Sequence, residues 1–228
     1  MTIPTTGSVQ EPFGLGGLRG LFEFIAGATL PDWETYAGSI RTIEVPARGL
    51  LFDIGDEDSA AYIVKRGCLR TAIVREGREW TTGFIRENQA LSPMPMAKLA
   101  SFGRPGTFTG TDFPSLLGIA EGKGADHRAI ALDDTVVFAA SLEVMWQLAI
   151  THPEWARMFF VMTLLQLAAA QKRERDLLTR SPEDRYRHFV QTNPDLMGKV
   201  AQKDIATYLG LTPVGLSRIV SRVRASGR

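Results

Sequence analysis

The chain has 228 residues, 44% of them hydrophobic and 22% charged, which suits a globular protein of one large domain or two small ones. Its net charge of +1 at pH 7 excludes a strong overall attraction to nucleic acid or to a membrane surface. The single cysteine, Cys68, excludes an internal disulfide and a four-thiolate iron–sulfur cluster, and we expect it to be a small core residue in a strand.

The amino-terminal segment predicts a loose arm followed by a short helix. Residues 1–20 are rich in Gly, Pro, Ser and Thr. A helix is expected from Leu21 to about Ala37, interrupted at Pro31, which can start a second turn. The segment shows no basic region followed by an apolar run, and no apolar stretch of the chain reaches about 18 residues. The sequence therefore predicts a cytoplasmic protein without a membrane span.

Residues 40–140 predict an all-β roll, barrel or sandwich. Short runs rich in β-branched and aromatic residues are separated by glycines or by charged turns. These runs are IRTIEV, LLFDIG, AAYIVKRG, CLRTAIV, EWTTGFI, HRAIAL and TVVFAAS. Residues 92–124 are rich in proline and glycine and give no clear assignment. Together with flanking helices, residues 21–150 are predicted to form one domain.

A long helix is predicted over residues 153–179, after a helix that begins near Leu142. Thr151 is a candidate cap, and the length is about 40 Å at roughly 1.5 Å per residue, more than a small domain needs. Candidate dimer contacts follow a 3–4 spacing, at Trp155, Met158, Phe159, Met162, Leu165 and Ala169. Apolar residues off this stripe are Val161, Leu164 and Leu167. We therefore expect one face on the β domain and another on a partner, with an ordinary core helix as the alternative.

The charge is unevenly distributed along the chain. From Arg180 to Arg228 there are nine Lys or Arg and four Asp or Glu, a net of +5, which leaves a net of −4 for the rest. A basic end on an acidic body indicates nucleic-acid binding at that end. Ser181, Pro182 and the two carboxylates that follow are typical of a helix start.

The stretch VAQKDIATYLGLTPVGLSRIVSR, residues 200–222, predicts two helices around a tight turn. Gly210 supplies the left-handed residue that ends the first helix, while Thr212 caps the second and Pro213 fills its first position. The apolar positions form one cluster, namely Ile205, Ala206, Leu209, Leu211, Leu216 and Ile219. This is the spacing of a helix-turn-helix, and a generic helical hairpin is the alternative.

Taken with the strand runs, this pattern resembles the Crp/Fnr family of transcription regulators from about residue 35 to 225. The specific part runs from HPEWARMFF, residues 152–160, through the terminal helices. The resemblance implies an α+β fold with an N-terminal double-stranded, jelly-roll-like β-roll and a long dimerisation helix over residues 151–179. A helix-turn-helix domain would fill residues 180–228.

The resemblance also implies DNA-binding residues. Arg218 matches the position of the family's base-reading arginine, whose guanidinium can bond O6 and N7 of guanine together. A phosphate contact or a solvated side chain is the alternative for Arg218. Thr212, Ser217 and Arg222 are candidate phosphate or base-edge contacts, and Gln202 and Lys203 are candidate backbone contacts.

Three features depart from the family pattern. Val214 stands where the family often has a glutamate that accepts from cytosine, and Gly215 beside it weakens the helix by about 1 kcal/mol relative to alanine. We also expect no β-hairpin wing, because few residues follow the second helix.

The sequence predicts no known effector site. A cyclic-AMP site in this family uses a Gly-Glu pair and a later Arg-Ser or Arg-Thr pair, but Gly118 is followed by Ile119 and Glu121-Gly122 has the reverse order. Arg128 comes too late, and Lys123 lacks the planar fork that suits phosphate. The three histidines are scattered and form no HxH pair, so we expect no metal, no cofactor and no cupin-type enzyme.

These features give one hypothesis and one alternative. The hypothesis is a homodimeric transcription regulator that binds palindromic double-stranded DNA, with RNA polymerase as a further candidate partner and an effector that is unknown or absent. The alternative is a cyclic-nucleotide-like sensor module whose DNA-binding unit is weak or vestigial.

Overall fold

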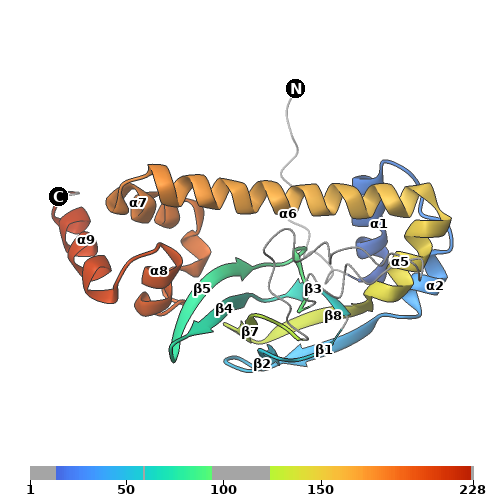
Figure 1. Ribbon diagram of the computed structural model, residues 1–228, viewed down its shortest axis with the longest axis horizontal. Helices are drawn as coiled ribbons and strands as arrows, with labels where there is room; N and C mark the ends of the chain where they lie inside the picture. Colours follow the sequence, from blue (N-terminus) through green and yellow to red (C-terminus); the bar gives the residue numbers. More distant parts are fainter. Residues whose placement is uncertain (1–13, 59, 94–123, 227–228) are drawn as a thin grey trace, which may run out of the picture.

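The computed structural model describes residues 14–58, 60–93 and 124–226. In Figure 1 one long helix runs along a side of the molecule. The amino-terminal helices lie beside one of its ends, a small helical unit lies beside the other, and the β-strands lie between them. This arrangement is the α+β fold that the sequence predicts.

The first helices differ from the expectation. They are α1 (Leu15–Ala26) and α2 (Trp33–Ala37). The first therefore begins six residues earlier than Leu21, within the segment that was expected to be a loose arm; residues 1–13 of that arm lie outside the described residues. Three glycines near the start of α1 lower its helix propensity, which hides it in the sequence. Burial of Leu18 and Phe22 against the core compensates for them.

Eight strands form two antiparallel sheets of four, within the described residues. One sheet has the order β1 (Arg41–Val45), β8 (Thr135–Ser141), β3 (Ala60–Arg66), β6 (Ala90–Leu91). The other has the order β2 (Leu50–Phe52), β7 (Arg128–Ala131), β4 (Leu69–Arg75), β5 (Arg78–Ile85). The seven predicted runs each contain one strand. Among the described strands, only β6, which has two residues, lies outside the runs that predict strands in the sequence.

Alternation along β3 divides the core into two layers. Tyr62 and Val64 point between the two sheets, where they pack with Phe52 and Val137. Ile63 points the other way, into a cluster made with α1, α2, α5 and α6. A strand with both faces buried needs a continuous apolar run, and AAYIV supplies it.

The link from β3 to β4 depends on a glycine. Gly67 has φ +94°, and a Cβ there would lie 2.6 Å from the hydroxyl oxygen of Thr135. Cys68 follows it and is buried, as expected for a small core residue, but it lies one residue before β4 rather than inside the strand.

Two further helices match their predicted bounds, α5 (Leu142–Thr151) and α6 (Pro153–Thr179). The predicted cap is wrong, because the hydroxyl of Thr151 donates to the carbonyl of Gln147 within α5 instead of capping α6. His152 is the residue immediately before α6, and its backbone conformation is extended. Among the described residues, no helix is long and apolar enough to cross a bilayer.

Candidate nucleic-acid interface

The carboxy-terminal unit contains two helices joined by a capped turn. After α7 (Pro182–Thr192) and the short turn η1 (Pro194–Leu196) come α8 (Gln202–Tyr208) and α9 (Pro213–Ser226). Gly210 has φ +67°, and the amide of Leu211 donates to the carbonyl of Ala206 at 2.8 Å, which closes the end of α8. The hydroxyl of Thr212 accepts from the amide of Gly215 at 3.0 Å, so it caps α9 as predicted.

The predicted apolar cluster holds the two helices together. Ala206 is 0% exposed, because α8 and α9 pack closely at its position. Leu209, Leu216 and Ile219 are buried in the same cluster, and Leu211 packs against it while partly exposed. A larger side chain at residue 206 would push the helices apart.

The predicted DNA-contacting side chains all lie on the surface. These are Gln202, Lys203, Thr212, Ser217, Arg218 and Arg222. Within the described residues Arg218 makes no ion pair, so its guanidinium is available. Arg222 makes a long ion pair, with its Nε 3.5 Å from a carboxylate oxygen of Glu183 on α7.

The start of α9 offers little direct recognition. Val214 is 63% exposed and presents an apolar surface at the position where the Crp/Fnr family often has a glutamate that accepts a hydrogen bond from cytosine. A Cβ at Gly215, the next residue, would lie 3.1 Å from the hydroxyl of Thr212 that caps the helix, which is a tight contact.

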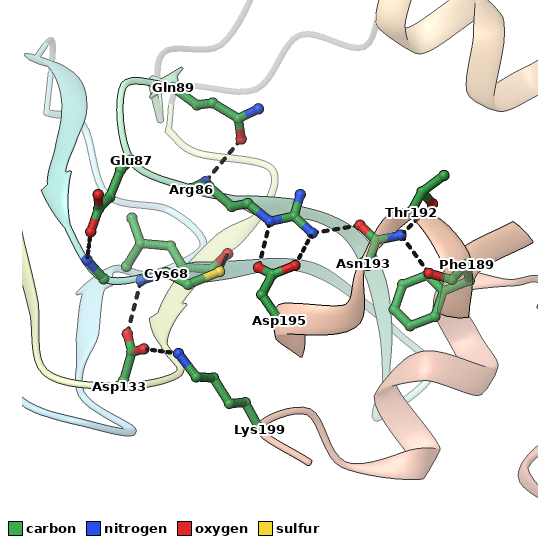
Figure 2. Close-up of polar contacts among 12 residues, drawn as sticks. Cys68, Arg86, Glu87, Gln89, Asp133, Phe189, Thr192, Asn193, Asp195 and Lys199 are labelled. Atoms are coloured by element: carbon green, nitrogen blue, oxygen red, sulfur yellow. Dashed lines mark hydrogen bonds and ion pairs between the residues drawn. The ribbon is translucent and has the colours of Figure 1, made fainter. Parts of the chain in front are cut away.

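A polar network docks this unit on the β-roll, and Figure 2 shows it. Arg86, which follows β5, donates from Nε to Asp195 at 2.9 Å and from Nη2 to the side chain of Asn193. Lys199 donates to Asp133 at 2.9 Å, from the loop before α8 to the turn between β7 and β8. No sequence signal marked these residues, because the partners are separated by 66 to 109 positions.

Further contacts extend the docking surface along β5 and α8. Arg70 is 6% exposed and shares its guanidinium between Glu79 at 2.7 Å and Asp204 at 3.3 Å. The backbone amide of Thr81 donates to the hydroxyl of Thr207 at 3.2 Å. These bonds fix α8 against the roll while Gln202 and Lys203 at its start stay exposed.

The apolar part of the docking surface is aromatic. Phe84 on β5 packs against Phe189 on α7 and Tyr208 on α8, with ring centroids 6.0 and 5.0 Å away. Cys68 belongs to the same cluster, and burial raises the pKa of its thiol to about 11, so the thiol stays protonated at neutral pH. The roll and the helical unit therefore share one core.

The docking network is expected to weaken in acid. Hydrogen bonding from Arg86 holds the pKa of Asp195 below its usual range. Burial would raise the pKa of Asp133, but Lys199 and the amide of Cys68 outweigh it and lower that pKa as well. Carboxyls with a lowered folded pKa contribute stability above their unfolded pKa of about 3.9 and lose it as the pH falls through the folded value.

We therefore expect Asp133→Asn/Asp195→Asn to lower the thermal midpoint at pH 6, and we expect the difference from wild type to shrink as the pH falls below about 3.9. The measurement is the midpoint of each protein from pH 6 down to pH 2.5. Curves that remain parallel over this range would contradict a role for the two carboxylates.

The candidate dimer residues divide into three groups by their exposure. Trp155 and Met158 are 0% and 1% exposed, packed inside their own protomer against α1, α2 and α5, which corrects the assignment of these two to a partner contact. Phe159 and Met162 are partly buried in the same cluster. Leu165 and Ala169 are exposed.

A second apolar row on α6 faces outward. Phe160, Leu164 and Leu167 follow a 4–3 spacing and are 61%, 46% and 52% exposed. We call these three residues the outer stripe. Leu164 and Leu167 are two of the apolar residues that lie off the 3–4 stripe in the sequence, and both are exposed.

Arg128, which comes too late in the chain to match the family's phosphate-binding arginine, is engaged by carboxylates within the roll. Arg128 donates through Nε and Nη2 to Asp53, at 2.8 and 3.1 Å, and through Nη1 to Glu79 at 2.9 Å. Its fork is therefore occupied by carboxylates. Residues 118–123, which carry the remaining comparison with a cyclic-AMP site, lie outside the described residues.

The histidines lie apart from one another. His127 contacts Asp126, and His152 contacts Asp32 at 2.9 Å. His188 lies on α7, far along the chain from both. No group of three or more potential metal ligands occurs within residues 14–58, 60–93 and 124–226.

Solved structures share this fold. No protein-family model matches the sequence, and no curated protein matches it. A transcriptional regulator assigned to the Crp/Fnr family, from Eubacterium rectale, aligns with a TM-score of 0.63 at 16% identity, over 86% of this chain and 83% of that one. FixK2 from Bradyrhizobium japonicum aligns with a TM-score of 0.62 at 18% identity, over 82% and 86%.

A cyclic nucleotide-binding domain containing protein from Listeria monocytogenes aligns with a TM-score of 0.57 at 10% identity, over 92% of this chain and 91% of that chain. The likeness therefore spans the roll, the long helix and the carboxy-terminal unit. It establishes the fold of the Crp/Fnr type at low sequence identity.

Proposed function

On this Crp/Fnr-type fold, we propose that the protein is a DNA-binding transcription regulator that acts as a homodimer on palindromic DNA. The observation that carries the proposal is the capped and well-packed helix-turn-helix, with Arg218 on the exposed face of α9 and without an ion-pair partner in the described part of the chain. A helix of this kind enters the major groove and reads base edges from its exposed side chains.

The geometry of α6 supports the dimer. The outer stripe leaves apolar side chains on a helix of 27 residues that connects the roll to the DNA-binding unit. Pairing of two such helices would hide the stripe and place two recognition helices on one side of the assembly. Half-sites about 34 Å apart, one helical turn of DNA, would then be contacted together.

The roll is proposed to act in some way other than by binding cyclic AMP. The support is that Arg128 binds the carboxylates of Asp53 and Glu79, so its charge is already balanced inside the roll. A cytoplasmic location and contact with RNA polymerase fit a regulator of this kind and stay predictions.

Arg218→Ala is expected to lower affinity for an operator selected from a random pool by about 5- to 150-fold, since a bidentate guanine contact contributes about 1–3 kcal/mol. Fluorescence anisotropy with labelled duplex, at two salt concentrations, measures the effect. Arg75→Ala, at the exposed end of β4, is the control and should bind as wild type does. If wild type shows no salt-dependent binding to any duplex, the DNA-binding proposal fails. The result would then favour the alternative of a ligand sensor whose DNA-binding unit is weak or vestigial.

A further inference from the structure

A basic cavity lies where the long helix meets the DNA-binding unit, away from the exposed face of α9. Its walls come from the last turns of α6, from α7 and from the end of α8, elements that lie together at one end of the molecule in Figure 1. Its volume is about 340 Å³, within the range of small-molecule sites. The recognition side chains make no use of it, although Phe189, Asn193 and Tyr208 of the docking surface contribute to its lining.

The walls carry an excess of positive charge. Lys172, Arg173, Arg180 and Arg185 line the cavity against the single carboxylate of Asp176. That carboxylate is already shared, because Arg180 donates to it at 2.6 Å and Lys172 at 3.1 Å. These two bonds lower the pKa of Asp176 to about 2.

Two guanidiniums have no carboxylate partner within the described residues. Arg173 lies over the ring of Tyr208, 4.2 Å from its centroid. Arg185 donates from Nη1 to the carbonyl of Leu177 at 2.7 Å, but its Nε is buried and has no acceptor. Buried donors are normally satisfied, so an unpaired one in the wall of a cavity indicates a missing acceptor.

The carboxy-terminal end of α6 does not account for this charge. A helix terminus carries about half of one negative charge, and the carbonyl of Leu177 already accepts from Arg185. Four cations against one carboxylate leave an excess that a bound anion would balance. Guanidinium groups match the geometry of phosphate, with two parallel N–H bonds.

The rest of the lining is mixed, with His188, Thr192 and Asn193 as polar members and an apolar and aromatic part. Phe189, Tyr208 and Leu209 border the cavity beside the two arginines. A ligand with an anionic group at one side and a planar ring at the other would match both parts. From the cavity, its charge and the unpaired Nε of Arg185, we infer that this site binds a small organic phosphate that carries a ring.

The inference does not depend on DNA binding, and the test uses the DNA-free full chain. Isothermal titration calorimetry with adenosine 5′-monophosphate and with inorganic phosphate, at constant ionic strength, is expected to show saturable binding of one molecule per chain, tighter for the nucleotide. Arg185→Gln should weaken the binding at least tenfold. Arg173→Gln, at the guanidinium that lies over the Tyr208 ring, should also weaken it.

Arg75→Gln is the matched control and should bind both probes as wild type does. Far-ultraviolet circular dichroism confirms that each variant is folded, and Arg173→Gln keeps the test open if loss of the Leu177 contact unfolds Arg185→Gln. Absence of saturable binding to wild type, or wild-type affinity in both cavity variants, would overturn the inference.

Phosphate could also come from the DNA backbone, and a second arm separates the two sources. The salt dependence of duplex binding is compared between wild type and Arg185→Gln. A salt slope reduced by about one in the variant, with no binding of the free probes, would assign the cavity to a DNA phosphate and overturn the small-molecule inference. An unchanged slope with nucleotide binding supports it.

Discussion

Leu164→Glu is expected to convert the proposed dimer into monomers and to lower affinity for a palindromic operator by about 10²- to 10⁴-fold. Leu164 is the middle residue of the outer stripe and is 46% exposed in the protomer, so the protomer itself tolerates a charge there. Against the same residue of a second copy, two carboxylates would be brought together in an apolar contact. In a monomer, the recognition helix bound at one half-site would no longer hold a second recognition helix near the other half-site. The gain in affinity from binding both half-sites together would therefore be lost.

Analytical ultracentrifugation measures the assembly, and anisotropy with full and half operators measures the binding. Leu50→Glu is the matched control, because Leu50 on β2 is 51% exposed and lies outside α6. The control should remain dimeric with wild-type affinity. A Leu164→Glu protein that stays dimeric would show that the copies associate through some other surface.

The sequence predicted the local structure well because its signals are local. Strands were found where β-branched runs lie between turns, and α9 was found from Thr212, Pro213 and the glycine before them. Each of these signals is complete within a few residues. The start of α1 could not be predicted for the same reason. Its glycines lower the local helix propensity, whereas the core contacts that stabilise the helix come from residues far away in the sequence.

The docking of the two parts could not be predicted in this way. Arg86 and Lys199 read as ordinary surface charges, and their partners follow only from the folded arrangement. Phe84 read as one more apolar strand residue, although it packs on the helical unit rather than inside the roll. A single sequence contains no periodicity that pairs such positions.

The assignment of the apolar stripe on α6 to a dimer contact is wrong for Trp155 and Met158, and it stays a prediction for Leu165 and Ala169. A 3–4 spacing shows which residues share a helix face, but it does not tell a core from an interface, since both are apolar. Trp155 begins the stripe inside the protomer, whereas Leu165 and Ala169 continue it onto the surface. The change occurs where α6 passes beyond the amino-terminal helices that cover its first turns.

Trp155→Ala is expected to lower the free energy of unfolding by about 3–5 kcal/mol, the usual effect of emptying a large buried aromatic site. Trp155 is 0% exposed, its ring stacks on Trp33 with centroids 6.2 Å apart, and its indole N–H donates to the carbonyl of Pro31 at 2.7 Å. The substitution removes all of these contacts at once and leaves that carbonyl without its donor. Chemical denaturation, followed by circular dichroism, measures the loss.

The position of Trp155 inside the protomer makes a further distinction possible. Trp80→Ala is the matched control, because Trp80 on β5 is 42% exposed and its removal should cost about 1 kcal/mol or less. At temperatures where Trp155→Ala is still folded, it should sediment as wild type does, whereas Leu164→Glu should dissociate without a comparable loss of stability. Wild-type stability combined with weaker self-association in Trp155→Ala would instead place this side chain at the contact between copies.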